Sequence, residues 1–422
     1  MKKRISSIIL VFVLIISTLL TTSCSLLGGT GDSYVTRDEL NAALDDAGAN
    51  STPGDTININ ISSDEENSIL AASKGLLSAV SVYCNFTVYY SGGYGPSSQK
   101  YEKTEQSAGA GVIYQLDKEK GNAYIITNYH VVYYHQSATS NYISNDITVY
   151  LYGQEYSKYA INATYIGGSM NYDIAILKVE NSTVLKSSNA MAATFSDSND
   201  VSILETAIAI GNPEADGISA TVGHINVDSE TIEIQASDNL STIAMRVMRI
   251  DAAVNSGNSG GGLYNAKGEL IGIVNAKMSS SSVDNIGYAI PSNIVKYVTD
   301  NIIYYCDGKS AESVYRYFMG ITTGISAAHT EYDTETGKIH KVETVVVSKV
   351  SSGAAAENVL AVGDIINSIT IDGKTYEVTR TFHVVDVMLN ARANSTVVLN
   401  ITRGDNTSDV TIDMSLAELT KY

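Results

Sequence analysis

Short apolar segments, each about as long as a single strand, follow one another through most of this 422-residue chain. They are rich in Val, Ile, Thr and Tyr, which fit a pleated and half-buried surface. Stretches that favour turns, such as 117–122 and 152–155, separate them. The first strands are predicted at 80–90, 110–114, 123–127, 147–151, 161–166 and 174–179, and a second series covers 206–290. This pattern predicts a mainly β fold built from barrels or a sandwich.

Helical spacing of apolar residues is confined to a few places. Residues 69–78 are predicted to form a short helix that opens the first domain. A second helix, with Ser292 as its N-cap and apolar residues from Ile294 to Ile302, is predicted to close that domain. After a linker at 306–312, the rest of the chain reads as a compact module of strands with one helix near 381–391.

Two details of that module are also predicted. Phe382, Val385 and Leu389 recur at helical spacing, which indicates a stripe that mostly faces the core. The stretch 330–341 is predicted to be an extended loop, with His329 and His340 as loop residues.

The first residues carry an export signal. Cations at positions 2–4 precede an apolar stretch at 8–20, which is too short to span a membrane as a helix. The small residues before Cys24 resemble the lipobox of bacterial lipoproteins, in which the cysteine is acylated; a plain signal peptide or an uncleaved anchor is the alternative. We therefore expect a signal peptide over 1–23 and a flexible tether over 24–67. The chain would be exported and lipid-anchored on the outer side of the cytoplasmic membrane.

Charge and cysteine usage exclude several classes of protein. The formal net charge of −18 argues against nucleic acid as a partner, because phosphates would be repelled by such a surface. No cysteine or histidine has the spacing of a metal site, so we expect neither a metal nor a cofactor. Cys84 and Cys306 could pair after export, but they lie in apolar surroundings without framework spacing, which favours two buried free thiols.

A serine among glycines, Gly257-Asn258-Ser259-Gly260-Gly261, is the candidate nucleophile. A nucleophilic serine needs an exposed hydroxyl on a tight turn and nearby backbone N–H groups for the oxyanion, and glycine permits that geometry. The same pattern fits the Gly-x-Ser-x-Gly elbow of α/β-hydrolases. In those enzymes a helix follows the serine, whereas 270–274 is predicted to be another strand.

Two further motifs lie upstream of the serine. His130 follows the buried strand predicted at 123–127, and Asp173 directly precedes the apolar strand at 174–179. Burying an aspartate is costly unless a partner compensates, and an imidazole N–H is such a partner. Each residue alone is also compatible with a structural role. The order His130, Asp173, Ser259 is that of chymotrypsin-like barrels, whereas subtilisins and α/β-hydrolases have other orders.

These three motifs, with Ile210-Gly211-Asn212-Pro213 and the segment 286–292, resemble the HtrA/Deg family of serine proteases over residues 68 to about 417. The resemblance implies a protease domain of two six-stranded barrels over 68–305, with the triad in the cleft between them. His130 would be the general base, Asp173 would orient it and Ser259 would attack. A homotrimer is implied as well.

The resemblance also implies an oxyanion hole. Its donors would be the backbone N–H groups of Gly257 and Ser259, together with Asn258. A shallow apolar S1 pocket with a wall near 273–276 is implied. Ala253 lies six residues before Ser259, where trypsin-like enzymes place a cation-binding aspartate, so cleavage after Lys or Arg is not expected.

Residues 306–422 resemble a PDZ domain. Phe318-Met319-Gly320-Ile321 matches the loop whose N–H groups bind the terminal carboxylate of a peptide, and 362–366 matches a strand start of that domain. The resemblance implies that a peptide adds to the sheet as an edge strand.

The export signal and the resemblance to the HtrA/Deg family together imply an extracytoplasmic serine endopeptidase for quality control. It would hydrolyse unfolded or damaged proteins and bind peptide C-termini at the PDZ domain. The alternative is a peptide-binding holdase or sensor with little proteolysis. The intact triad favours the protease, because a pure binder need not retain all three residues.

Overall fold

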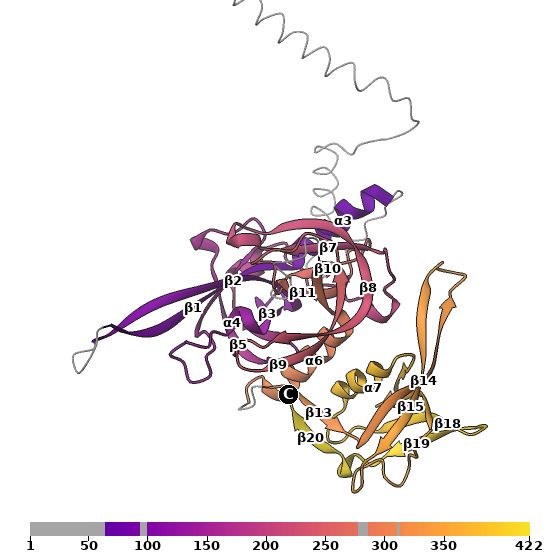
Figure 1. Ribbon diagram of the computed structural model, residues 1–422. Coiled ribbons are helices and arrows are strands. Elements are labelled where there is room, and N and C mark those ends of the chain that lie inside the picture. The colour runs from indigo at the N-terminus through magenta and orange to yellow at the C-terminus, as the bar shows by residue number, and fades with distance from the viewer. Residues whose placement is uncertain (1–63, 93–98, 277–285, 310–312) are drawn as a thin grey trace, which may run out of the picture. The chain divides into compact units, whose positions relative to one another are not determined.

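The computed structural model describes residues 64–92, 99–276, 286–309 and 313–422 (Figure 1). These residues belong to one compact unit, 61–422. The predicted signal peptide over 1–23, Cys24 and nearly all of the predicted tether lie outside the described residues. Within the described ranges, no helix is both long and apolar enough to cross a membrane.

Strands between residues 79 and 179 form a closed antiparallel barrel in the order β1-β2-β3-β6-β5-β4. Its strands are β1 (Ala79–Gly92), β2 (Gln99–Asp117), β3 (Asn122–Thr127), β4 (Asp146–Leu151), β5 (Ile161–Ser169) and β6 (Ile174–Val179). Buried and outward-facing residues alternate along β4, as expected for a strand with one face in the core. The inward side chains, among them Ile125 and Leu177, form one buried cluster.

A second closed barrel follows, in the order β10-β11-β12-β9-β8-β7. Its strands are β7 (Thr206–Gly211), β8 (Ser219–Gln235), β9 (Thr242–Ile250), β10 (Gly262–Tyr264), β11 (Leu270–Val274) and β12 (Gly287–Pro291). Met248 and Ile271 belong to its buried interior. The predicted pair of six-stranded barrels is confirmed.

A third apolar cluster lies between the barrels. It combines Ile126 and Ile174 of the first barrel with Ile210 and Ile273 of the second. Two helices, α3 (Asp64–Ser78) and α6 (Ser292–Cys306), add side chains to the same cluster. The shorter helices are α4 (Tyr129–Val132), α5 (Thr183–Ser187), η2 (Ser157–Tyr159), η3 (Ser198–Asp200) and η4 (Pro213–Ala215).

The start of α6 corrects one prediction. Pro291 occupies the N-cap position, and Ser292 is the first helical residue. Ser292 Oγ donates to Ser196 O at 2.7 Å instead of capping the helix. The physical reason is that β12 runs directly into α6, so no residue is left between them to act as a polar cap.

The C-terminal module has its own sheet and core. β14 (Ile321–Tyr332), β15 (Ile339–Val350), β16 (Ile365–Ile371), β18 (Val397–Arg403) and β19 (Asn406–Ile412) form the sheet in this order, with β17 (Lys374–Glu377) on β16. β13 (Tyr315–Phe318) pairs with β20 (Glu418–Lys421) in a separate two-stranded sheet. The helical segments are α7 (Thr381–Val387), η6 (Met388–Asn390) and η7 (Met414–Leu416).

One prediction about this module was wrong, and another holds only in part. The supposed loop at 330–341 is the tip of the long β14–β15 hairpin, in which His329 pairs with Val342 and His340 with Glu331 (Figure 1). Val385 is 43 % exposed on α7, so the predicted stripe does not face the core throughout. Leu389, the last residue of the predicted stripe, is fully buried, as expected.

Candidate active site

The predicted base and its aspartate lie next to the ends of two paired strands of the first barrel. β3 ends at Thr127 and His130 follows in α4, while β6, which pairs with β3, begins directly after Asp173. His130 Nδ1 lies 2.7 Å from Asp173 Oδ2, and the His130 backbone N–H donates to Asp173 Oδ1 at 3.0 Å. The aspartate side chain is 4 % exposed and the histidine side chain 17 %. The ring thus reaches the surface with the carboxylate buried behind it.

The backbone of Asp173 is held by several contacts. Its φ of 48° lies in the left-handed region, which Asp tolerates better than most residues other than glycine. Its carbonyl oxygen accepts from Tyr129 N–H at 3.2 Å and from Asn128 Nδ2 at 2.8 Å. Its own N–H donates to Met170 O at 3.3 Å. These bonds fix the turn that points the carboxylate at His130.

The second barrel supplies Ser259, in the turn before β10. Ser259 O accepts from Ala110 N–H of β2 at 2.8 Å, which ties the serine turn to the first barrel. Ser259 Oγ accepts from Ala276 N–H at 3.2 Å. Among the described residues, Oγ bonds to this amide and not to His130. Catalytic hydrogen bonds often tighten only once substrate binds, so this arrangement is compatible with a resting site.

Two backbone donors beside the serine are available for an oxyanion. The N–H groups of Gly257 and Ser259 donate to no described residue, whereas Asn258 N–H donates to Asn255 O at 3.0 Å. The Asn258 backbone N–H is therefore engaged inside the turn, whereas those of Gly257 and Ser259 are not.

The need for glycine at position 257 is visible in the packing. Gly257 has a φ of 93°, and a Cβ placed on it would lie 2.1 Å from Asn212 O. Asn212 is fully buried; its N–H donates to Gly257 O at 3.3 Å and its Nδ2 donates to Gly109 O at 3.2 Å. The Ile210–Pro213 motif therefore braces the serine turn.

Sequence reasoning missed Asn275. This residue follows β11 and is fully buried, and its Nδ2 donates to Asp173 Oδ2 at 2.7 Å. The same carboxylate oxygen thus accepts from the His130 ring and from the Asn275 amide. An asparagine after a strand normally indicates a turn, so no local sequence signal marks Asn275 as part of the site. Its amide reaches Asp173 only because the two barrels dock against each other.

The loop predicted to bind a carboxylate lies between β13 and β14. Phe318 is 39 % exposed, while Met319 and Ile321 are buried. The N–H groups of Met319 and Gly320 donate to no described residue. β14 is the end strand of its sheet, so its outer edge is open to a further strand.

Gly320 is tightly constrained in this loop. Its φ is 87°, and a Cβ would lie 2.0 Å from Ala354 Cβ. Its carbonyl oxygen accepts from Ser351 N–H at 2.7 Å, and Met319 O accepts from Ala356 N–H at 3.0 Å. The loop is therefore fixed to the segment that follows β15.

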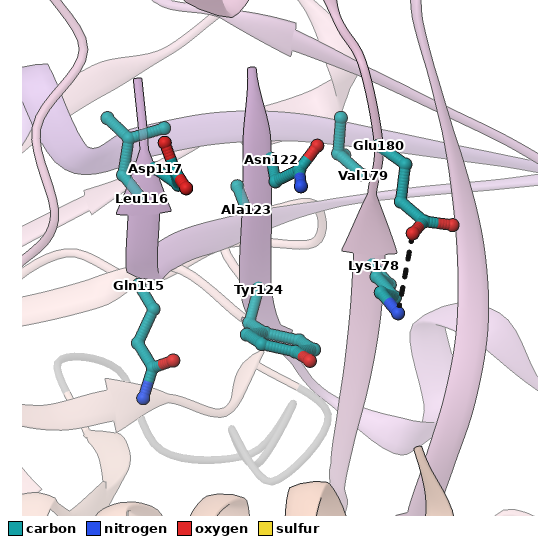
Figure 2. A pocket seen from close by; sticks show the side chains of 9 residues that line it. All are labelled: Gln115, Leu116, Asp117, Asn122, Ala123, Tyr124, Lys178, Val179 and Glu180. Carbon is teal, nitrogen blue, oxygen red and sulfur yellow. Dashed lines mark ion pairs between the residues drawn. The ribbon is translucent and has the colours of Figure 1, made fainter. Parts of the chain in front are cut away.

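A surface hollow of about 380 Å³ lies on the first barrel, away from all these residues. It is lined by Gln115, Leu116, Asp117, Asn122, Ala123, Tyr124, Lys178, Val179 and Glu180. Figure 2 shows these side chains spread over neighbouring strands, with Lys178 paired to Glu180 at 3.5 Å. None of the predicted site residues lines it.

The structure also bears on the two cysteines and on possible metal ligands. Cys84 and Cys306 are buried, as predicted. Cys306 Sγ donates to Ser313 O at 3.3 Å, and burial raises the pKa of the Cys84 thiol to about 12. No group of His, Cys, Asp or Glu in the described ranges is arranged to hold a metal ion.

Comparison with known proteins identifies the family. Residues 109–273 match the trypsin-like peptidase domain, and residues 320–414 match the PDZ domain. The serine protease Do-like HtrA of Bacillus subtilis is 38 % identical over 208 residues, which cover 49 % of this chain and 42 % of that protein. The serine protease Do-like HtrA of Lactococcus lactis subsp. lactis is 30 % identical over 379 residues, covering 86 % and 85 %. The chain belongs to the HtrA family of serine proteases.

This membership confirms the resemblance inferred from the motifs. The HtrA-family chain is a serine endopeptidase with one trypsin-like domain and one PDZ domain, and the alternative of a peptide-binding holdase or sensor with little proteolysis is not favoured. A further relative, the periplasmic serine endoprotease DegP of Escherichia coli, is 30 % identical over 289 residues, or 66 % of this chain and 51 % of that protein.

Proposed function

We propose that His130, Asp173 and Ser259 form the catalytic triad. Ser259 Oγ attacks the scissile carbonyl carbon as its proton passes to His130 Nε2. Asp173, 2.7 Å from Nδ1, fixes the tautomer in which Nε2 can accept that proton, and stabilises the imidazolium. His130 then protonates the leaving amine, and a water molecule repeats the sequence to release the acyl group.

The oxyanion of the tetrahedral intermediate is held by the N–H groups of Gly257 and Ser259. Each such donor contributes on the order of a hundred- to a thousandfold to the rate. The resting bond from Ala276 N–H to Ser259 Oγ breaks when the hydroxyl turns to His130. The observation that carries the proposal is the pairing of His130 with a buried carboxylate opposite a serine turn with two unengaged amides.

A serine-directed probe tests the assignment. A fluorophosphonate should label Ser259, and Ser259→Ala should abolish both labelling and casein hydrolysis while leaving the folded state intact. Ser256→Ala, on the same turn, is the matched control and should keep both. Casein hydrolysis that survives in Ser259→Ala would reject the triad.

The substrates are unfolded or damaged proteins, cut after small or medium aliphatic residues. Supporting this, Ala253 offers no charge to a basic P1 side chain, and Ala276 lies beside the nucleophile, as expected for a wall of a shallow S1 pocket. Mapping the cleavage sites in an unfolded protein by mass spectrometry tests this. Dominant cleavage after Lys or Arg would refute it.

The PDZ domain binds free peptide C-termini. The carboxylate would be held by the Met319 and Gly320 amides, and the peptide would pair with β14 beside α7, on which Val385 is exposed. Amidating an apolar C-terminal peptide removes the recognised charge and should weaken its binding strongly. Equal affinity of the free and amidated peptides would reject this mode.

The protein acts outside the cytoplasm, attached through lipidated Cys24 after removal of residues 1–23, and assembles as a homotrimer. The export signal in the sequence and the periplasmic DegP relative support the compartment. Cys24→Ala should lose the lipid and leave the membrane fraction. Light scattering of the purified protein measures the oligomer.

A further inference from the structure

A cluster of two tyrosines and one arginine links the turn that carries Asp173 to the PDZ domain. Tyr172 directly precedes Asp173, Arg316 lies on β13, and Tyr422 follows β20, which pairs with β13. Arg316 Nη1 donates to Tyr172 Oη at 3.3 Å, and Nη2 donates to Tyr422 Oη. The guanidinium carbon lies 4.1 Å from the centre of the Tyr422 ring. Arg316 is therefore held between the two phenols.

The Tyr172 phenol is neutral in this cluster. Burial raises the pKa of Tyr172 to about 12, and the positive charge of Arg316 only partly offsets this. The phenol is thus neutral across the working range of an enzyme, and its oxygen accepts from a permanent cation. Hydrogen bonds with one charged partner are stronger than those between neutral groups.

Tyr172 is well placed to control the catalytic aspartate. The turn at 170–173 is the whole connection between β5 and β6. Asp173 sits in that turn with a φ of 48°, so a loosened turn can relax toward commoner backbone angles and carry the carboxylate away from His130. A displacement of about 1 Å in a catalytic group can cost about a hundredfold in rate.

Arg316 is itself anchored by its neighbour. The backbone of Tyr315 is bound to the fully buried Asn301 of α6: Tyr315 N–H donates to Oδ1 at 2.9 Å, and Nδ2 donates to Tyr315 O at 2.7 Å. Arg316 also lies two residues before Phe318, where the predicted carboxylate-binding loop begins. The guanidinium therefore projects from a strand with a fixed position.

We propose that Arg316 is a positioning residue for proteolysis: acting through Tyr172, it holds the turn of Asp173 and keeps the carboxylate aligned with His130. The alignment of the triad then depends on the seating of β13, the strand that enters the PDZ loop. This inference rests on the proposed role of Asp173 in the triad.

The test uses Tyr172→Phe, which deletes one hydroxyl, and Arg316→Met, which deletes the charge. Both should lower kcat for a short peptide substrate by about 5- to 50-fold, with KM changed less than about twofold, because ground-state contacts with substrate are untouched. The acid limb of the pH profile of kcat/KM should also move, because the contact between His130 and Asp173 loosens. Arg316→Lys retains a cation and should recover part of kcat.

Tyr114→Phe is the matched control. The Tyr114 hydroxyl also bonds charged groups on another element, donating to Asp300 Oδ1 at 2.5 Å and lying 3.0 Å from Lys296 Nζ, but it is not part of the triad turn. The Tyr114→Phe substitution should lower the free energy of unfolding without changing kcat. If Tyr172→Phe and Arg316→Met behave like this control, the inference is overturned. If Asp173→Asn also leaves kcat unchanged, the triad assignment falls with it; if Asp173→Asn is inactive, only the role of Arg316 falls.

Discussion

Replacing Asn275 with alanine should slow proteolysis, because it removes a donor from the Asp173 carboxylate that is proposed to orient His130. The Asn275 amide donates to Asp173 Oδ2 at 2.7 Å inside a fully buried environment. Two other donors from His130, its ring Nδ1 and its backbone N–H, stay in place. The Asp173 carboxylate therefore still has hydrogen-bond partners in the variant, but it loses one of the three hydrogen bonds that fix its orientation.

The size of the effect follows from these contacts. A hydrogen bond to a charged group contributes about 1.5–3 kcal/mol, and about 1.4 kcal/mol corresponds to a tenfold rate change, so kcat/KM should fall by about 10- to 150-fold. Losing the carboxylate itself costs about 10⁴-fold in trypsin-like enzymes, which sets an upper limit. Asn275→Asp should be worse than alanine, because it places a second carboxylate against Asp173.

Asn265→Ala provides a matched control. Asn265 is also a buried asparagine whose Nδ2 donates to a carboxylate, at 2.9 Å, but that carboxylate belongs to Glu269 and not to Asp173. Steady-state kinetics should be measured for both variants beside urea unfolding. The reasoning fails if the two variants lose equal activity at equal stability, or if folded Asn275→Ala is as active as the wild type.

Three further outcomes are expected. Gly257→Ala should reduce fluorophosphonate labelling, since its Cβ would lie 2.1 Å from Asn212 O at a φ of 93°, and the oxyanion turn must shift. Gly320→Ala should lower the stability of the PDZ domain in urea unfolding, because its Cβ would meet Ala354 Cβ at 2.0 Å. Burial lowers the pKa of His383 from 6.5 to about 4, so folding favours the neutral ring. The contribution of the neutral ring to the free energy of unfolding is fully present above about pH 6.5. It should be lost as the pH falls to about 4, by up to about 3 kcal/mol. In urea titrations at different pH values, His383→Asn should depend less on pH than the wild type.

The barrels could be predicted because their strands carry a strong local signal. β6 begins and ends where its apolar run predicts, at Ile174–Val179, and β11 agrees with the predicted 270–274. In both strands nearly every residue is buried, so hydrophobicity alone sets the boundaries.

The two long hairpins could not be predicted in this way. β2 begins at Gln99, well before the predicted 110, and its first part is a polar sequence paired with β1 from Gln99↔Gly92 onward (Figure 1). The β14–β15 tip at 330–341 is equally polar. Backbone hydrogen bonds hold these segments, and such bonds leave no periodic pattern of apolar side chains.

The residues of the candidate site likewise include some with a local sequence signal and some without one. His130, Asp173 and Ser259 were predictable because each lies at a strand end or glycine turn with a recognisable motif. Asn275 and Arg316 were not, because their contacts with Asp173 and Tyr172 come from elements far away in the chain. The residues proposed to do the chemistry carry local signals, whereas those proposed to orient them are defined by how the elements dock.

The way the barrels dock should therefore also set the alignment of the site. Two adjacent residues allow this effect on catalysis to be distinguished from a general loss of stability. Ile125 and Ile126 are adjacent on β3 and both are buried, but Ile125 packs inside the first barrel whereas Ile126 belongs to the cluster between the barrels. Truncation of either to alanine should cost about 2–5 kcal/mol of unfolding free energy. Ile126→Ala should in addition lower kcat per folded molecule, because it loosens the interface across which Ala110 binds Ser259. Equal kcat for the two folded variants would show that the barrels align the site without this cluster.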